Sequence, residues 1–374
     1  MLTRAAILRE SPGKFEIVDI ELDEPRQDEI QVKMAATGLC HSDYHLRTGD
    51  AYASHYPFIC GHEGAGIVEA VGPETSGWDV GDHVVFGFIP SCGQCRWCSE
   101  GMTNLCDLGA YLYRGSRFDD LDSFRYRLPD GTSVGQSCGI GTFAERTTVS
   151  VDSAIKVDKD LPLDKLCLLG CGVGTGWGSA VYAAKTAPGD VVLVMGTGGV
   201  GINAVQGAAQ AGAMAVIAVD PVEYKRDVAL ELGATHAFAS MEEADRFAKS
   251  ITNWQGADKA IVTVGSLEGS HIAEAMAAIC KGGTVVLTAA APHDYTGGIP
   301  VHPRELVNLQ KRLVGALFGQ CNARSDIPRQ IQMYRSGRLK LDELVTRTYT
   351  LDDVEPAYED MMAGRNIRGV VVFD

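Results

Sequence analysis

The chain has 374 residues, 45% of them hydrophobic and 22% charged, with a formal net charge of −15 at pH 7. This length exceeds the size at which one hydrophobic core stops growing, so we expect two domains, and the composition excludes a disordered protein. The negative charge argues against nucleic acid or an anionic membrane as a partner, because both would repel it. Residues 1–20 show no signal-peptide pattern and no apolar run is long enough to span a bilayer, so we expect a cytoplasmic protein.

Short apolar runs, interrupted by Pro, Gly and Asp, dominate the first 150 residues. This pattern predicts strands joined by turns. The clearest runs are residues 5–8, 15–18, 30–32, 66–72 and 82–86. We therefore expect a first domain that is largely β.

Cys40 and His62 lie in two short motifs, Cys40-His41-Ser42-Asp43 and Gly61-His62-Glu63. An isolated Cys or His is more often a core residue, but the neighbours here favour an open metal site. Asp43 is suited to accept the second ring N–H of a ligating histidine, and Glu63 adds another carboxylate. Such a site needs a third ligand, which these motifs do not supply.

Four cysteines form a second pattern, with spacings that allow one short loop to bring all the thiolates to a single ion. They are Cys92, Cys95, Cys98 and Cys106. Zinc accepts a closed tetrahedron of four sulfurs. Disulfides are the alternative, but in a cytoplasmic protein clustered cysteines indicate metal binding. A closed site has no position for substrate, so this pattern predicts a structural zinc.

Residues 107–141 are rich in Arg, Asp, Tyr and Gly and show no clear periodicity. A loop of this length in a compact domain is usually functional, although a mobile surface excursion fits the composition equally well. The cysteines outside the two metal patterns are interpreted as buried small side chains or unreactive thiols. These are Cys60, Cys138, Cys167, Cys280 and Cys321.

From about residue 173 apolar runs alternate with helical patterns. A strand at 191–195, a glycine turn, a helix at 200–211 and a strand at 215–219 predict the first unit of a doubly wound sheet. Further strands at 260–264 and 284–289 and helices at 242–251 and 270–279 continue the pattern.

The glycine turn carries the residues expected at a dinucleotide phosphate. They are Gly196, Gly198, Gly199, Val200 and Gly201. Glycines let backbone N–H groups approach a pyrophosphate at a helix N-terminus. Asp220, at the end of the next strand, is expected to accept hydrogen bonds from the adenosine ribose and to repel a 2′-phosphate, which favours NAD over NADP. Lys225 and Arg226 are cations that could partly accommodate such a phosphate.

Taken together, the motifs resemble those of zinc-dependent medium-chain alcohol dehydrogenases over essentially the whole chain. The shared order and spacing include Cys40-x2-Asp43, the block from Gly61 to Gly72, the four-cysteine lobe, Gly170-Cys171-Gly172 and the glycine turn. The resemblance implies an α/β architecture with a GroES-like β-rich catalytic domain (residues 1–172 and 318–374) and a Rossmann, doubly wound parallel-sheet coenzyme domain (173–317). It also implies two zinc ions and NAD(H) per chain, and a homodimer or larger homo-oligomer paired through the coenzyme sheets.

The same resemblance assigns roles to individual residues. Cys171 becomes the third catalytic zinc ligand, although the sequence alone does not separate it from Cys167. Ser42 takes the alcohol proton and passes it, through the nicotinamide ribose, to His45. Asp43 orients His62, and Glu63 acts on the metal from the side away from the substrate. His41 and Arg368 contact the pyrophosphate, and Thr175 packs on the nicotinamide. Phe88 forms part of the wall of the substrate pocket.

The expected reaction is oxidation of an alcohol by NAD to an aldehyde or ketone. Residues 170–178 and the 107–141 segment look similar to nicotinoprotein alcohol dehydrogenases, which retain NAD(H) and pass electrons to an external acceptor such as N,N-dimethyl-4-nitrosoaniline. Four alternatives stay open: an alcohol dehydrogenase with exchangeable NAD, a formaldehyde dehydrogenase acting on a thiol adduct, a zinc-free quinone or enone reductase, and a non-enzymatic binding protein built on the four-cysteine lobe. The sequence does not identify the alcohol.

Overall fold

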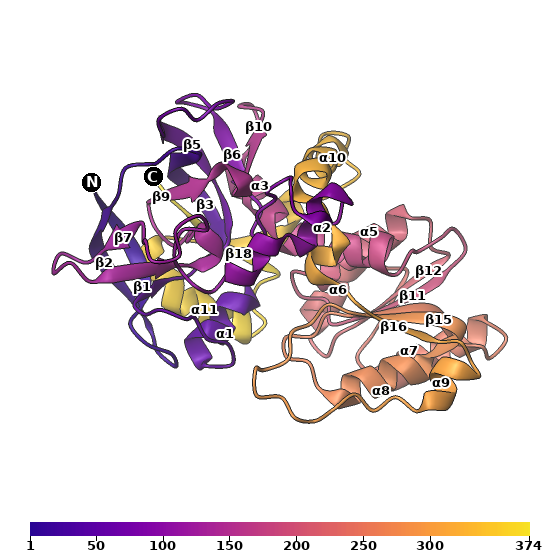
Figure 1. The fold of residues 1–374 in the computed structure, drawn as a ribbon. Helices are drawn as coiled ribbons and strands as arrows, with labels where there is room; N and C mark the ends of the chain where they lie inside the picture. The colour runs from indigo at the N-terminus through magenta and orange to yellow at the C-terminus, as the bar shows by residue number, and fades with distance from the viewer. The chain divides into compact units, whose positions relative to one another are not determined.

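The computed structural model describes residues 1–374, which form two compact units. The first contains Met1–Cys171, Asn322–Ser336 and Leu341–Asp374, and the second contains Gly172–Cys321 and Gly337–Lys340. In Figure 1 the yellow C-terminal elements β18 and α11 lie among the indigo and magenta strands of the first unit. The chain thus leaves this unit and returns to complete it.

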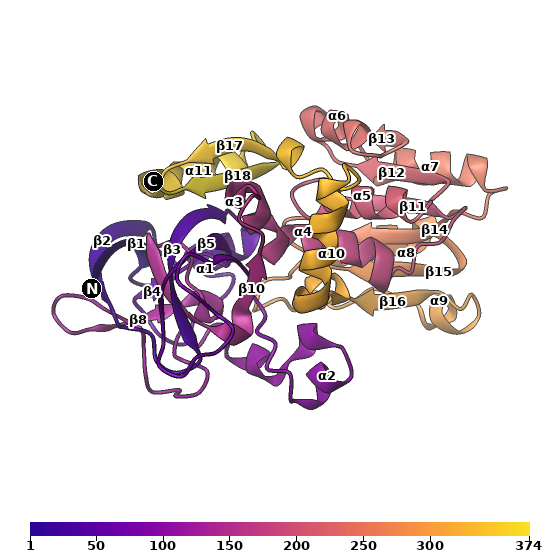
Figure 2. The same ribbon diagram turned by 90° about the horizontal axis from the view of Figure 1, so that it is seen from above.

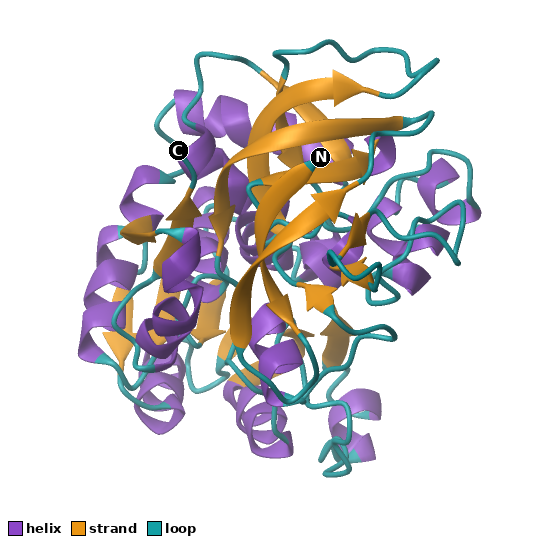
Figure 3. Ribbon diagram, turned by 90° about the vertical axis from the view of Figure 1, so that its left-hand side faces the viewer, coloured by secondary structure: helices purple, strands orange, loops and turns teal.

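The first unit contains a small closed barrel in the strand order β1-β2-β7-β8-β4. Its strands are β1 (Leu2–Leu8), β2 (Phe15–Leu22), β4 (Phe58–Ile59), β7 (Tyr126–Arg127) and β8 (Ser133–Gln136). Apolar residues from β1 and β4, together with Phe143 and Tyr358, fill the adjoining core. The curved strands of this unit, drawn in orange, face the viewer in Figure 3.

A second sheet of the first unit runs in the order β10-β6-β5-β3-β18-β17, with β9 paired to β3 off this path. Its strands are β3 (Glu29–Gly38), β5 (Glu63–Val71), β6 (His83–Phe86), β9 (Arg146–Ser150), β10 (Ala154–Val157), β17 (Val345–Tyr349) and β18 (Arg368–Val372). The antiparallel register of β3 pairs Gly38 with Glu63 on β5 and with Val370 on β18. This register places the start of β5 and the start of β18 at the same end of β3.

Five α-helices belong to this unit. They are α1 (His41–Thr48), α2 (Arg96–Ser99), α3 (Leu163–Leu166), α10 (Ala323–Arg335) and α11 (Val354–Met362). In Figure 2 the lobe that carries α2 stands apart from the barrel strands β1, β4 and β8. A lobe this small has little apolar interior of its own, so it needs another source of stability.

The second unit is organised around one parallel sheet in the order β13-β12-β11-β14-β15-β16. The strands are β11 (Val191–Met195), β12 (Ala215–Val219), β13 (His236–Phe238), β14 (Ala257–Val262), β15 (Ile279–Leu287) and β16 (Arg312–Gly315). Every residue of β11 and β12 is buried, as expected where helices cover both faces of a sheet. This is the dinucleotide-binding strand order, so the predicted fold class is confirmed.

The connecting helices are α4 (Gly172–Gly178), α5 (Gly201–Gln210), α6 (Glu223–Glu231), α7 (Met241–Ile251), α8 (Gly269–Ala278) and α9 (Pro303–Val307). Figure 1 shows α5 on one face of the sheet and α7 and α8 on the other. Ala244, Ala248, Ile272 and Ala275 point into the core under the sheet, which explains why the apolar residues of α7 and α8 recur at helical spacing.

The two compact units do not end where the expected domains do. Residues 318–321, assigned from the sequence to the first domain, belong to the second unit, as do Gly172 and Gly337–Lys340. The reason is close packing on α4: the Sγ of Cys321 lies 3.2 Å from the carbonyl of Gly174. A Cβ on Gly178 would come within 2.5 Å of the carbonyl oxygen of Gly319, so the two backbones touch there.

The 107–141 segment is tied to the first unit by two buried arginines. Arg117 and Arg125 are 0% and 2% exposed, and both pair with the carboxylate of Glu29 at the start of β3. Arg125 also donates to the side chain of Gln136 at 2.9 Å. The buried charges favour an anchored structural element over a loose surface excursion.

No single helix of the chain has the length and apolarity that a membrane span requires, although the bent pair Leu163–Gly170 and Gly172–Ala183 passes that test jointly.

Candidate functional site

Four potential metal ligands converge in the first unit: one donor atom from each of Cys40, His62, Glu63 and Cys171 lies within 4.8 Å of all the others. Cys40 immediately precedes α1, His62 and Glu63 stand at the start of β5, and Cys171 follows a short 3₁₀ helix. The structure brings Cys171 to this cluster and leaves Cys167 outside it, where its thiol contacts the carbonyl of Asp164. This is the distinction that the sequence alone did not make.

His62 is oriented from behind by Asp43. Its Nδ1 lies 3.0 Å from Oδ2 of Asp43, and the other carboxylate oxygen accepts the backbone N–H of Gly61 at 2.8 Å. Both side chains are buried, so neither contact competes with bulk water. With Nδ1 facing the carboxylate, Nε2 is the ring nitrogen left for a metal, which is the arrangement found behind ligating histidines.

The charges around His62 suit a cation. Burial alone would lower the pKa of His62, but Asp43, Cys40 and Cys171 raise it well above its ordinary value. The Cys171 thiol donates to Cys40 and holds the pKa of Cys40 well below its usual range, and the same contact raises the pKa of Cys171. A divalent ion would replace the remaining proton, since metal ligands bind deprotonated. Two thiols and an imidazole are a donor set that zinc accepts.

Glu63 and Arg368 form a buried ion pair beside this cluster. Arg368 also donates to the carbonyl of Leu39 at 3.1 Å and is only 4% exposed. Burial raises the pKa of Glu63 to about 7, although Arg368 opposes the shift. Gly38 makes room for the pair: a Cβ there would lie 2.3 Å from Oε2 of Glu63.

The remaining residues predicted for proton transfer lie on α1. The hydroxyl of Ser42 lies 3.7 Å from the sulfur of Cys40. One helical turn separates His41 from His45, and their ring centroids lie 5.3 Å apart. Phe88 presents its ring edge-on to His62 at a centroid distance of 5.7 Å, so it lies beside the four potential metal ligands.

The four cysteines of the α2 lobe also converge. The donor atoms of Cys92, Cys95, Cys98 and Cys106 all lie within 4.8 Å of one another. Backbone N–H groups reach two of the sulfurs, from Cys95 to Cys92 at 3.4 Å and from Cys98 to Cys95 at 3.5 Å. N–H donors of this kind, from Asp107 and Cys98, lower the pKa of Cys95 to about 7, and thus favour the thiolate that zinc requires.

In the second unit the glycine turn follows β11 as predicted. A Cβ on Gly201 would lie 1.8 Å from the carbonyl oxygen of Gly196, so only glycine allows α5 to start this close to the strand. A Cβ on Gly198 would meet nothing within 4 Å, so this residue leaves space above the turn. The turn thus has the tight geometry and the open approach that a pyrophosphate site needs. Val200 occupies the position directly before α5.

Asp220 braces the same turn with both carboxylate oxygens, which accept the backbone N–H of Thr197 at 2.9 Å and of Val222 at 3.0 Å. Each oxygen retains a second lone pair for a ribose hydroxyl. Arg226, considered from the sequence as a partner for a 2′-phosphate, instead donates to the carbonyl oxygens of Asp220 and Pro221 at 2.9 Å each. Lys225 stands beside it on α6, and Thr175 lies on α4.

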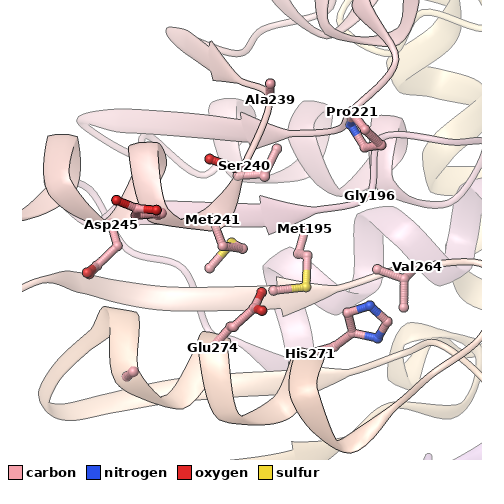
Figure 4. Close-up of a pocket in the computed structure, with 13 residues that line it drawn as sticks. Met195, Gly196, Pro221, Ala239, Ser240, Met241, Asp245, Val264, His271 and Glu274 are labelled. Atoms are coloured by element: carbon pink, nitrogen blue, oxygen red, sulfur yellow. The ribbon is translucent and has the colours of Figure 1, made fainter.

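A pocket of about 520 Å³ opens at the carboxyl ends of β11, β12 and β14. Figure 4 shows Pro221, Ser240, His271 and Glu274 around it. Open α/β sheets bind ligands at this edge. Among the residues that line this pocket, only Gly196 was predicted as a site residue. The signal that was available is that Ala239 and Val264 each follow closely on a strand end.

The comparisons with known proteins agree with this geometry. Residues 26–159 match the family "Alcohol dehydrogenase GroES-like domain", and residues 199–336 match "Zinc-binding dehydrogenase". The chain belongs to this family of zinc-binding alcohol dehydrogenases, which confirms the resemblance drawn from its motifs.

Individual relatives span the whole chain. It is 48% identical to an NDMA-dependent alcohol dehydrogenase of Amycolatopsis methanolica, covering 100% of this chain and 99% of that protein. Among solved structures, an alcohol dehydrogenase zinc-binding domain protein from Burkholderia ambifaria superposes with a TM-score of 0.92 at 31% identity, covering 100% and 99% of the two chains. Benzyl alcohol dehydrogenase of Acinetobacter calcoaceticus superposes with a TM-score of 0.89 at 28% identity, and both chains are fully covered.

Proposed function

We propose that the protein oxidises an alcohol to an aldehyde or ketone with NAD, at a catalytic zinc held by Cys40, His62 and Cys171. The observation that carries the proposal is the convergence of these three donors, with Asp43 directing the ring of His62. When bound, zinc would act as a Lewis acid on the alcohol oxygen and NAD would accept the hydride.

The chain's own residues handle the proton. Ser42 stands next to Cys40 and carries a hydroxyl that both donates and accepts, so it receives the alcohol proton and passes it on. His45 is the imidazole on the same helix that takes up this proton and delivers it to solvent. Phe88 excludes water on the side of His62 and offers an apolar surface to the substrate.

Glu63 is close enough to the cluster to compete for the fourth metal position. We propose that it remains behind the metal, because its carboxylate is held by Arg368 in a buried ion pair. The fourth position then stays available to the alcohol. If Glu63 occupied the fourth position instead, the alcohol could not reach the metal.

A second zinc is proposed for Cys92, Cys95, Cys98 and Cys106, where it would cross-link the small α2 lobe. We further propose that NAD binds along the glycine turn with Asp220 at the adenosine ribose. Contacts of His41 and Arg368 with the pyrophosphate, of Lys225 with the adenosine end and of Thr175 with the nicotinamide remain proposals. The reduced thiols that both metal sites require agree with a cytoplasmic location.

The 48% identity to an NDMA-dependent enzyme supports retention of NAD(H) during turnover, with electrons passed to an external acceptor. We also propose a homodimer through β16. This edge strand pairs only with β15. Val307 on α9, shortly before β16, is 74% exposed, and Leu317, two residues after β16, is 50% exposed. Light scattering that gave a monomer would reject the dimer.

The decisive experiment combines metal analysis with a panel of primary and secondary alcohols, assayed with free NAD and with N,N-dimethyl-4-nitrosoaniline. The wild type should contain two zinc ions per chain and oxidise at least one alcohol. Cys40→Ser and His62→Ala should each lose one zinc and all turnover while keeping the fold. Cys167→Ser is the matched control, since this buried thiol lies four residues from Cys171 but outside the cluster, and should keep both.

Two results would reject the proposal. Full turnover in Cys40→Ser would refute the assignment of the catalytic zinc. One zinc per wild-type chain, at the four cysteines, would favour a reductase that has no catalytic zinc. Gel filtration tests retention of the coenzyme: nicotinamide absorbance that stays with the protein supports it, and ready exchange with free NAD excludes it.

A further inference from the structure

We propose that Asp50 is a positioning residue for proton transfer: it fixes the tautomer of His45, so that Nε2 is the ring nitrogen that takes up the proton. This inference deepens the proposed function and rests on His45 being part of the proton path. The observation behind it is that Nδ1 of His45 lies 3.3 Å from Oδ2 of Asp50.

The local fold explains how the two side chains meet. Helix α1 ends after Thr48, and Gly49 adopts a left-handed conformation with φ of 87°, so the chain reverses direction. The carbonyl of His45 accepts the backbone N–H groups of Gly49 and Ala51, at 3.1 and 3.0 Å. This turn brings Asp50 back to the side chain of His45, five positions earlier in the chain. Glycine is needed here because L-residues with a side chain rarely adopt this φ.

Asp50 is itself held in place. Thr48 donates its hydroxyl to Oδ2 of Asp50 at 2.7 Å, the same oxygen that faces His45. The Thr48 hydroxyl and His45 lower the pKa of Asp50, so the carboxylate is ionised near neutral pH. The side chain of His45 is 9% exposed and that of Asp50 is 43% exposed. The pair therefore connects a buried imidazole with solvent.

The chemistry follows from the donors and acceptors. An ionised carboxylate only accepts hydrogen bonds, so a neutral His45 that contacts it carries its proton on Nδ1 and keeps a lone pair on Nε2. Without a partner, neither tautomer is enforced, and part of the population presents an N–H where an acceptor is required. After proton uptake at Nε2, the Nδ1–H group still faces the same carboxylate. The ring of His41 on the same helix lies 5.3 Å from that of His45, and the ring of Tyr44 lies 5.7 Å from that of His41. Neither residue supplies a carboxylate.

The test measures the tautomer directly, by ¹⁵N NMR of the histidine rings in the full-length holoenzyme, with His45→Gln used to assign the signal. Wild-type His45 should show the Nδ1–H tautomer when neutral. Asp50→Ala should lose this preference and reduce turnover about tenfold, the size expected for one charge-assisted hydrogen bond. Asp50→Glu should restore part of both, and Thr48→Val should give an intermediate effect. Asp122→Ala, at a fully exposed aspartate, is the control and should change neither.

The outcomes separate the inference from the proposed function. If Asp50→Ala leaves the His45 tautomer unchanged, the inference is overturned, whatever the enzyme does. If the tautomer changes but both Asp50→Ala and His45→Gln turn over normally, His45 lies outside the proton path, and the relay and the role of Asp50 fall together while the zinc assignment stands.

Discussion

Replacing Glu29 by glutamine should destabilise the first unit by far more than a surface charge change would. The Glu29 carboxylate is 4% exposed and is shared by two buried guanidinium groups. Arg117 pairs with one oxygen, and Nε of Arg125 donates to the other at 2.8 Å. The backbone N–H of Arg26 adds a third donor at 2.9 Å.

The magnitude follows from what the substitution leaves behind. Glutamine keeps the shape and one acceptor oxygen but removes the negative charge that the two guanidinium groups share. Arg125 then loses its carboxylate partner, and Arg117 keeps only the carboxylate of Asp23 at 3.5 Å. Removing one partner of a buried ion pair typically costs about 3–5 kcal/mol. We therefore expect Glu29→Gln to lower the free energy of unfolding by that amount. The matched control is Glu69→Gln: its pair with Arg146 is about a third exposed, so the expected loss is below about 1 kcal/mol.

Two measurements check this. Urea denaturation gives the free energies, and amide hydrogen exchange shows where protection is lost. Because Arg117 and Arg125 anchor the 107–141 segment, its amides should lose protection before those of the barrel strands. Equal losses in Glu29→Gln and Glu69→Gln, or unchanged protection in 107–141, would refute the anchoring role.

The pH dependence has a defined sign. Burial would raise the pKa of Glu29, but Arg125 and Arg117 outweigh it and lower the pKa below its ordinary value. A carboxyl whose pKa is depressed by folding stabilises the protein above its unfolded pKa of about 4.3 and loses this contribution as the pH falls through the folded value. The stability difference between wild type and Glu29→Gln should therefore be constant near neutrality and shrink below about pH 4.

Further predictions concern the glycine turn, the α2 lobe and the buried arginine of β18. Gly201→Ala should destabilise the second unit, because its Cβ would lie 1.8 Å from a carbonyl oxygen. Gly198→Ala should fold normally but bind NAD at least about tenfold more weakly, which calorimetry would detect. Cys98→Ser should remove one zinc and make the lobe sensitive to protease, and a strong chelator should do the same in the wild type; a resistant lobe would contradict structural zinc. Arg368→Met should release Glu63 from its ion pair, so that its carboxylate can take the fourth metal position. Turnover should then fall while metal analysis still gives two zinc ions per chain, and wild-type turnover would argue against the role of the ion pair.

Much of the fold was predictable because its signals are local. The strands expected at 191–195 and 215–219 coincide with β11 and β12, and the helix expected at 200–211 contains α5. Parallel strands buried on both faces are continuous apolar runs, and the change from strand to glycine turn to helix takes only a few residues. The four cysteines of the α2 lobe were equally accessible, since the whole cluster spans fifteen positions.

The parts that were missed depend on distant residues. Nothing near Glu29 in the sequence points to Arg117, 88 residues away, and Glu63 meets Arg368 across 305 residues. The 107–141 segment lacked periodicity, so its two buried arginines looked like surface charges. The end of the second unit at Cys321 was not predictable, because the packing of Gly319 and Cys321 on α4 depends on backbone contacts that leave no pattern in the sequence.

The amino-acid sequence by itself predicted the four-cysteine cluster, the glycine turn and the strands that support it, because each is specified by neighbours within one loop or one turn of helix. It also pointed to Cys40 and His62 through the residues that flank them. Only the tertiary structure decided that Cys171 rather than Cys167 joins Cys40 and His62, and that Arg368 holds Glu63. It also showed that Asp50 faces His45. The physical reason is that a ligand set or an ion pair forms between side chains that are close in space. The entropic cost of closing a loop grows only slowly with its length, so the sheet register can bring together residues that are far apart in the sequence.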